Sequence, residues 1–243
     1  MQIVDKGLIL RETAYKEADV MLTVLTECAG KLSVVARGAK RKGSRVSAAI
    51  QLFAYSEFTL YENGGRYTLN EAEPIELFYG IRDDLIKLSL ASYFSEVLEQ
   101  AADADTINPE LLRLGLNSLF ALSKTDIPNE KIKAVFELKA AELSGYAPNL
   151  NFCMGCGCSD NLFLFDVKNG SVVCSECATG VCMDIDASVL DALRYISTED
   201  IKRIFSFKIN DGSMKILSEL SNSYLRTHFD RNFKTDAFYK ALL

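Results

Sequence analysis

Short apolar runs separated by polar residues occupy the first third of the chain. They predict strands over residues 3–10, 20–25, 32–36, 58–61 and 67–69. Asn63-Gly64-Gly65 separates the last two runs. Asn-Gly between alternating strands predicts a hairpin, because a type I′ turn needs positive φ at both central positions. Five short strands in about 70 residues indicate a small closed barrel, of which an OB-like barrel is one kind.

After Pro74 the spacing of apolar residues becomes helical. It predicts helices over residues 85–101, 109–120 and 129–144, and again over 187–196, 198–205 and 213–229. Asn108 precedes Pro109 as an expected N-cap, Gly145 ends the third helix, and Ser213 is the cap expected for the last. The fold class is therefore α+β, with an N-terminal five-stranded OB-like β-barrel followed by an α-helical domain with a four-cysteine, zinc-ribbon-like insert. We expect domain limits at 1–79 and 80–243, with the zinc-binding insert at about 150–184.

Six of the seven cysteines lie between residues 153 and 182. Cys153, Cys156, Cys174 and Cys177 follow the pattern C-x₂-C-x₁₇-C-x₂-C, which is typical of zinc ribbons. Residues 162–166 and 171–173 form a predicted hairpin that brings the second pair back to the first. Four thiolates saturate a tetrahedral zinc ion and leave no position for water or substrate, so the expected role is structural.

Two other interpretations of the cysteines stay open. A redox-active Cys-x-x-Cys needs one pair alone, and neither pair begins a helix after a strand. An iron–sulfur cluster would draw on Cys158 and Cys182 as further ligands. The spacing favours one zinc ion over both, and either extra cysteine could replace a primary ligand.

Basic residues are concentrated between residues 31 and 50, which hold six lysines and arginines and no acidic residue. The net charge is −6, so the rest of the chain carries −12. Directly after the third predicted strand, a flexible, extended loop presents five candidate DNA contacts: Arg37, Lys40, Arg41, Lys42 and Arg45. Such a loop can follow a phosphate backbone without reading bases. The competing interpretation is an ordinary solvated loop, as most charge runs are.

Motifs that would indicate an enzyme are missing. There is no phosphate-binding Gly-rich loop, no Gly-x-Ser-x-Gly, and no zinc-deaminase signature. The one histidine, His228, is far from the cysteines in sequence. We therefore expect a binding protein and not an enzyme. The rivals are a thiol- or metal-dependent enzyme and an interaction scaffold that acts only through protein partners.

The chain also lacks features of export. No run reaches the roughly 18 apolar residues of a membrane-spanning helix, and residues 1–6 do not resemble the start of a signal peptide. We expect a cytoplasmic protein with no membrane partner.

Several ordered segments resemble the RecO family of bacterial recombination mediators. They are Gly7-Leu8-Ile9-Leu10-Arg11, Tyr15-Lys16-Glu17-Ala18-Asp19, Gly30-Lys31-Leu32, Ala36 to Arg41, Gly145-Tyr146-Ala147-Pro148-Asn149-Leu150 before Cys153, and the tail from Tyr224 to Lys234. The resemblance implies an OB barrel, a helical domain with a zinc insert, and no catalysis.

It also implies binding of single- and double-stranded DNA, annealing of complementary strands, and loading of RecA onto DNA coated by single-strand-binding protein. RecR, and in some routes RecF, are the implied partners, and the implied location is the bacterial nucleoid. Under this resemblance Cys153, Cys156, Cys174 and Cys177 match the family's zinc cysteines, and the five basic residues from Arg37 to Arg45 match its basic barrel loop.

Overall fold

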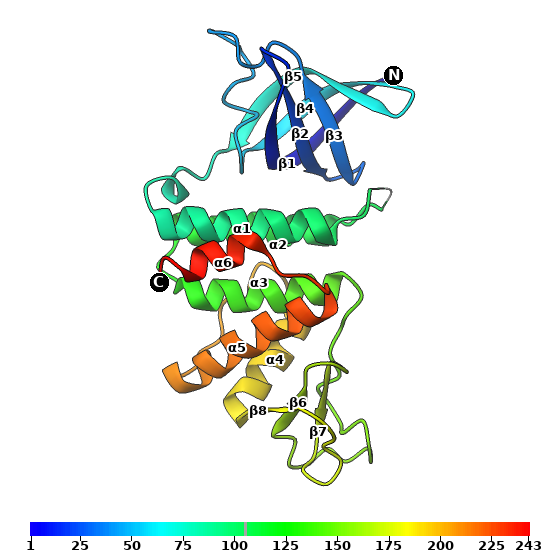
Figure 1. The fold of residues 1–243 in the computed structure, drawn as a ribbon, viewed down its shortest axis with the longest axis vertical. Helices are drawn as coiled ribbons and strands as arrows, with labels where there is room; N and C mark the ends of the chain where they lie inside the picture. The colour runs from blue at the N-terminus through cyan, green and yellow to red at the C-terminus, as the bar shows by residue number, and fades with distance from the viewer. Residues whose placement is uncertain (105) are drawn as a thin grey trace. The chain divides into compact units, whose positions relative to one another are not determined.

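The N-terminal part is a closed five-stranded barrel in a computed structural model that describes residues 1–104 and 106–243 (Figure 1). Its strands are β1 (Gln2–Tyr15), β2 (Asp19–Thr26), β3 (Lys31–Ala36), β4 (Tyr55–Asn63) and β5 (Arg66–Glu76). They pair in the order β1-β2-β3-β5-β4, and β3 with β5 is the one parallel pair among them. The predicted five-stranded barrel is confirmed, and this order matches an OB-like Greek key.

The predicted β4–β5 hairpin is also confirmed. Its two-residue loop is Gly64-Gly65, and Asn63 pairs with Arg66 across it. Both glycines have positive φ, +58° and +75°, as a type I′ turn requires. The turn is therefore centred one residue later than Asn-Gly alone would place it.

Six α-helices follow the barrel in the described residues, with a 3₁₀ turn η1 (Tyr79–Ile81) before them. They are α1 (Leu85–Ala101), α2 (Pro109–Lys124), α3 (Asn129–Leu143), α4 (Ala187–Thr198), α5 (Asp211–His228) and α6 (Lys234–Lys240). The side chain of Asn108 caps α2 by accepting from the backbone N–H of Leu111 at 3.1 Å, as predicted. No helix within the described residues combines the length and apolar character that a membrane crossing requires.

Two helix predictions are wrong. The segment 198–205 is not a helix: α4 ends at Thr198, and the Asp200 side chain accepts from the N–H of Lys202 at 2.8 Å. An aspartate bonded to backbone two residues later favours a turn over a helix. The cap of α5 is Asn210 and not Ser213, which lies inside the helix and donates to Asp186 at 2.6 Å.

The chain forms two compact units. The first contains residues 1–125 and 234–243, which comprise the barrel, η1, α1, α2 and α6. In this unit Gly115 permits the close approach of α2 to its neighbours, because a Cβ there would lie 2.7 Å from Leu98 of α1 and 3.4 Å from Leu8 of β1. The first unit thus extends beyond the barrel to the helices that pack with it.

The second unit, residues 126–233, contains α3, α4, α5 and a small sheet. The sheet has the order β7-β6-β8, with β6 (Leu164–Asp166), β7 (Ser171–Val173) and β8 (Met183–Asp184). The β6–β7 pair is the predicted hairpin, now confirmed, whereas β8 gave no sequence signal.

A fully buried carboxylate joins α3 to α5 in the second unit. Glu137 has no exposed surface and accepts from Lys133 Nζ at 2.6 Å. It also accepts from Ser221 Oγ at 2.9 Å and Asn222 Nδ2 at 2.7 Å. A buried charge is tolerated only with such partners.

We expect Lys133→Met to destabilise the second unit by about 3–5 kcal/mol, because it removes a cation bonded to the buried Glu137 carboxylate. Tyrosine fluorescence during urea unfolding measures this. The matched control is Arg113→Met, which breaks the exposed Arg113–Glu110 pair and should cost less than about 1 kcal/mol. Equal losses for the two variants would contradict the interpretation.

Candidate metal centre and nucleic-acid interface

The β6–β7 hairpin brings cysteines that are 18 and 21 residues apart into one cluster. The sulfur of Cys174 lies 3.8 Å from that of Cys153 and 3.7 Å from that of Cys156. Together with Cys158, these four sulfurs lie within 4.8 Å of one another. Three of the four predicted ligands are therefore mutual neighbours, and Cys158 is a fourth.

The remaining predicted ligand, Cys177, lies beside the same group. A Cβ on Gly155 would be 2.8 Å from the Cys177 sulfur, so the second Cys-x-x-Cys turn packs against the first where glycine leaves room. Cys182 does not belong to the group of four within 4.8 Å. Because five thiols meet at one place, the choice between Cys158 and Cys177 as fourth ligand stays open, and the predicted ligand set stays a prediction.

Contacts within the cluster lower the pKa of some thiols and raise the pKa of others. Backbone N–H groups of Cys174 and Gly155, each 3.4 Å from the Cys153 sulfur, favour its thiolate. Backbone hydrogen bonds, first from Cys174, then from Cys156 and Gly155, lower the pKa of Cys153 to about 6. The side chain of Cys156, followed by burial, raises the pKa of Cys158 to about 12. The Cys156 side chain is likewise the main cause that raises the pKa of Cys177 to about 12.

This donor set fits a thiophilic cation. Neighbouring thiolates repel one another, so without a cation the first to ionise makes its neighbours keep their protons. A divalent ion removes that repulsion and holds several thiolates at once. Sulfur ligands with N–H donors to one of them suit zinc or an iron–sulfur site, and not a hard cation such as Mg²⁺.

The hairpin that carries the cluster is fixed to α5. The Asp166 side chain accepts from the N–H groups of Lys168 and Asn169, each at 3.0 Å, which shapes the turn. Gly170 then lies against the Tyr224 hydroxyl, where a Cβ would be only 2.6 Å away. His228 Nε2 lies 3.2 Å from the Val167 carbonyl oxygen, and burial lowers its pKa. The one histidine thus packs behind the hairpin turn.

The five predicted DNA contacts follow β3 on the surface of the barrel. Arg37, Lys40, Arg41, Lys42 and Arg45 are all exposed. Among the described residues, no carboxylate lies within ion-pair distance of any of them. The cations of this loop are therefore free to meet an anionic partner.

The loop is not extended, contrary to the sequence prediction. Residues 37–50 form successive turns with hydrogen bonds from Arg41 N to Gly38 O and from Ser44 N to Arg41 O. Ala39 and Ile50 are buried in the barrel core. Burial of these apolar residues draws the loop onto the barrel, and only its charged side chains remain in solvent.

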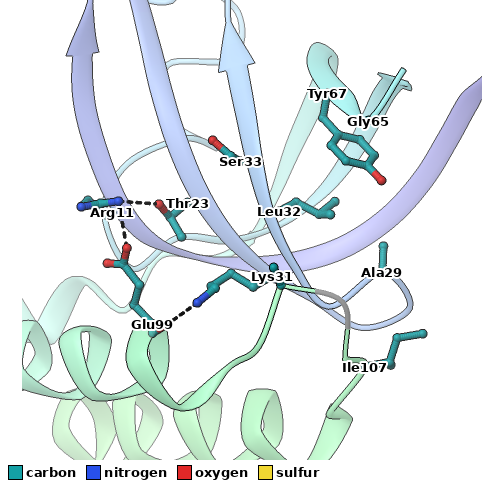
Figure 2. A pocket seen from close by; sticks show the side chains of 11 residues that line it. Arg11, Thr23, Ala29, Lys31, Leu32, Ser33, Gly65, Tyr67, Glu99 and Ile107 are labelled. Carbon is teal, nitrogen blue, oxygen red and sulfur yellow. Dashed lines mark hydrogen bonds and ion pairs between the residues drawn. The ribbon is translucent and has the colours of Figure 1, made fainter. Parts of the chain in front are cut away.

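A groove crosses the outer face of β1, β2 and β3 next to this loop. It consists of two connected hollows of about 490 and 680 Å³, which share Ser33, Gly65 and Tyr67. The smaller hollow is lined by Tyr15, Lys16 and Arg66 together with Arg37 of the loop. The larger one reaches Glu99 of α1 (Figure 2).

Sequence reasoning missed most of this groove. Tyr15 and Lys16 were available as a signal, because they stand at the β1–β2 turn, one of the loops with which OB barrels bind ligands. Among the aromatic residues on and beside the barrel strands, Phe53 and Phe58 are buried at 2% and 1% exposure. Tyr67 lines the groove, whereas Tyr61 on β4 is 50% exposed and lines neither hollow.

Family profiles of known proteins match both the barrel and the helical part of the chain. The family profile described as recombination protein O N terminal matches residues 1–78, and the C-terminal profile matches residues 82–237. A protein named DNA repair protein RecO from Alkaliphilus metalliredigens is 35% identical over 239 residues, or 97% of each chain.

Relatives of the same name give similar coverage. The protein from Acetivibrio thermocellus is 33% identical over 97% of this chain and 95% of its own. The protein from Bacillus subtilis is 29% identical over 96% and 92%. Since the profiles meet near the end of the barrel and span both the groove and the cysteine cluster, the chain belongs to the recombination protein O (RecO) family.

Proposed function

We propose that this chain is a non-enzymatic, cytoplasmic DNA-binding mediator of recombination in DNA repair. It binds single- and double-stranded DNA, anneals complementary strands, and with RecR helps to load RecA onto DNA coated by single-strand-binding protein. Membership of the family supports a role in DNA repair and recombination. The observation that carries the DNA-binding part is a group of five exposed cations, without an ion pair to any described residue, beside a groove lined by tyrosines.

Loop and groove form one continuous surface. The N–H of Lys40 donates to the carbonyl of Ala18 at 3.0 Å, and the N–H of Gly38 donates to the Asp19 carboxylate at 2.8 Å. These bonds hold the basic loop against the β1–β2 turn that bounds the groove. Phosphates would meet the loop and unstacked bases would meet Tyr15 and Tyr67, the combination that serves single-strand binding in general.

Charge distribution explains how an acidic protein would bind DNA on one face. On the β4–β5 side of the barrel, Glu57 pairs with Glu73 across the two strands, and Glu71 follows on β5. These glutamates are exposed and repel a polyanion. The uneven field would direct DNA to the loop and groove, and binding would weaken steeply with salt.

Annealing needs no catalytic group on this surface. Cations that neutralise phosphates reduce the repulsion between two strands, and base pairing supplies the specificity. The surface would read backbone charge and stack bases without selecting a sequence.

A structural zinc ion is the proposed cofactor of the cysteine cluster. Cys153, Cys156 and Cys174 would hold it, with Cys177 or Cys158 as the fourth ligand. The ion would supply the cohesion that a three-stranded sheet of 2 to 3 residues per strand cannot provide by itself. Phe165 and Val172 of the hairpin are buried, and they would be exposed if the module opened.

Neutralising the basic loop should weaken DNA binding about tenfold or more at low salt. The variant is Lys40→Ala, Arg41→Ala, Lys42→Ala and Arg45→Ala together, measured by fluorescence anisotropy with labelled single-stranded DNA. Its plot of log affinity against log salt should be shallower by roughly 0.7 for each lost phosphate contact.

The control for that experiment removes the same charge from the second unit, through alanine at Lys202, Arg203, Lys208 and Lys215, which are also exposed. Equal effects of the two quadruple variants would mean that net charge and not the loop matters. If the native chain binds no DNA, it would have to act through protein partners.

Tyr15→Ala should lower affinity for single-stranded DNA by roughly 1–3 kcal/mol, the usual value of one base–aromatic stack. Tyr61→Ala is the matched control, because Tyr61 is similarly exposed (50% against 41%) but does not line either hollow. The two variants should differ in anisotropy titrations, and should bind double-stranded DNA equally. A loss shared by both variants would argue against stacking in the groove.

The purified protein should contain about one zinc per chain, measured by inductively coupled plasma mass spectrometry. Cys153→Ser should lose it, while Cys28→Ser, at an exposed cysteine outside the cluster, should keep it. Comparing Cys158→Ser with Cys177→Ser identifies the fourth ligand. Iron with visible absorbance, or full zinc content in Cys153→Ser, would contradict the proposed site.

A further inference from the structure

The end of the groove next to α1 holds two cations that are already bonded to one residue. Arg11 Nη2 lies 2.9 Å from the carboxylate of Glu99, and Lys31 Nζ donates to the backbone carbonyl of Glu99 at 2.6 Å (Figure 2). These contacts contrast with the basic loop, where no ion pair is found for the five cations among the residues that the structure describes. A phosphate that entered this end of the groove would have to compete with Glu99.

The two contacts differ in how easily another anion could replace the Glu99 oxygen. Lys31 is half-buried and bonds a carbonyl in the last turn of α1, where a cation stabilises the helix end. Arg11 is 60% exposed and its carboxylate partner is 27% exposed. An exposed pair of this kind contributes little to stability and is readily replaced by another anion.

Glu99 is also poorly placed for the helix itself. It lies in the last turn of α1, which contains no basic residue. The C-terminal end of a helix is electronegative and disfavours a carboxylate. The position therefore does not serve the helix, and the contact with Arg11 is what Glu99 gains there.

We propose that Glu99 is an internal competitor of DNA, whose carboxylate occupies Arg11 in the free protein and is displaced by a phosphate on binding. This inference rests on the proposed DNA-binding function and adds a device that limits affinity. The guanidinium of Arg11 has five N–H donors, and its contact with Thr23 Oγ1 is long, 3.5 Å. It can therefore turn from the carboxylate to a phosphate in the same hollow.

Removing the competitor should strengthen DNA binding. We expect Glu99→Gln to raise affinity for single-stranded DNA about two- to fivefold at low salt, the range that one exposed ion pair supplies. The slope of log affinity against log salt concentration should become steeper by less than about one. The midpoint of thermal unfolding should change little, because an ion pair with an exposed partner such as Arg11 contributes little to stability.

Two comparisons separate this mechanism from a general effect of charge. Glu73→Gln makes the same change of charge on β5, outside both hollows, and should raise affinity less. In a chain that already carries Arg11→Gln, adding Glu99→Gln should raise DNA affinity no more than Glu73→Gln does. The reason is that the guanidinium with which Glu99 pairs is no longer present.

The competitor mechanism is overturned if Glu99→Gln and Glu73→Gln act alike, or if the gain persists without Arg11. Loss of binding in the basic-loop variant together with either of these results would keep the DNA-binding function and reject the competitor alone. A native chain that binds no DNA at low salt would reject both.

Discussion

Pairing of β1 on both of its edges closes the barrel, and the features of the first unit depend on it. Residues 2–8 of β1 pair with β4, while residues 7–15 pair with β2. The register shifts between Ile9 and Arg11, and there the backbone of Ile9 exchanges hydrogen bonds with Phe53 and Ala54. A bulge of this kind bends a strand and redirects its side chains. The bulge leaves Arg11 on the groove side of the strand. The hydrogen bonds of Ile9 with Phe53 and Ala54 also fix the end of the segment that carries the basic loop.

Closure of the barrel places basic and acidic side chains on different parts of its surface. The loop between β3 and β4 sends small apolar residues into the core and its lysines and arginines into solvent. The glutamates of the β4–β5 side face solvent as well, on other strands. A chain with net charge −6 can in this way present a local cationic surface, because fields near a surface are set by the nearest charges when salt screens the rest. Glu99 belongs to this balance, as an acidic group placed within the cationic surface.

The second unit depends on a different constraint. Its small sheet has few residues with which to build a core; Gly170 packs against Tyr224, and five thiols lie together beside the sheet. The buried Glu137 adds a fixed polar contact between α3 and α5. Such contacts tolerate little rearrangement, since a buried charge without its partners is costly. The second unit thus depends on fixed contacts, whereas the first presents a groove and exposed cations at its surface.

Local patterns in the sequence determined the strands, the β4–β5 hairpin, helices α1 to α3, the cap at Asn108 and the Cys-x-x-Cys pairs, because each depends on neighbouring residues. Tertiary structure decided what depends on distant ones. Compaction of the basic loop needed a core for Ala39 and Ile50, and the meeting of Cys158 with Cys174 needed the hairpin between them. The groove was invisible because its walls come from β1, β3, the β4–β5 turn and α1. The contact of Arg11 with Glu99, far apart in the sequence, exists only because the barrel packs on α1: sequence supplies the charges, and the fold decides which of them meet.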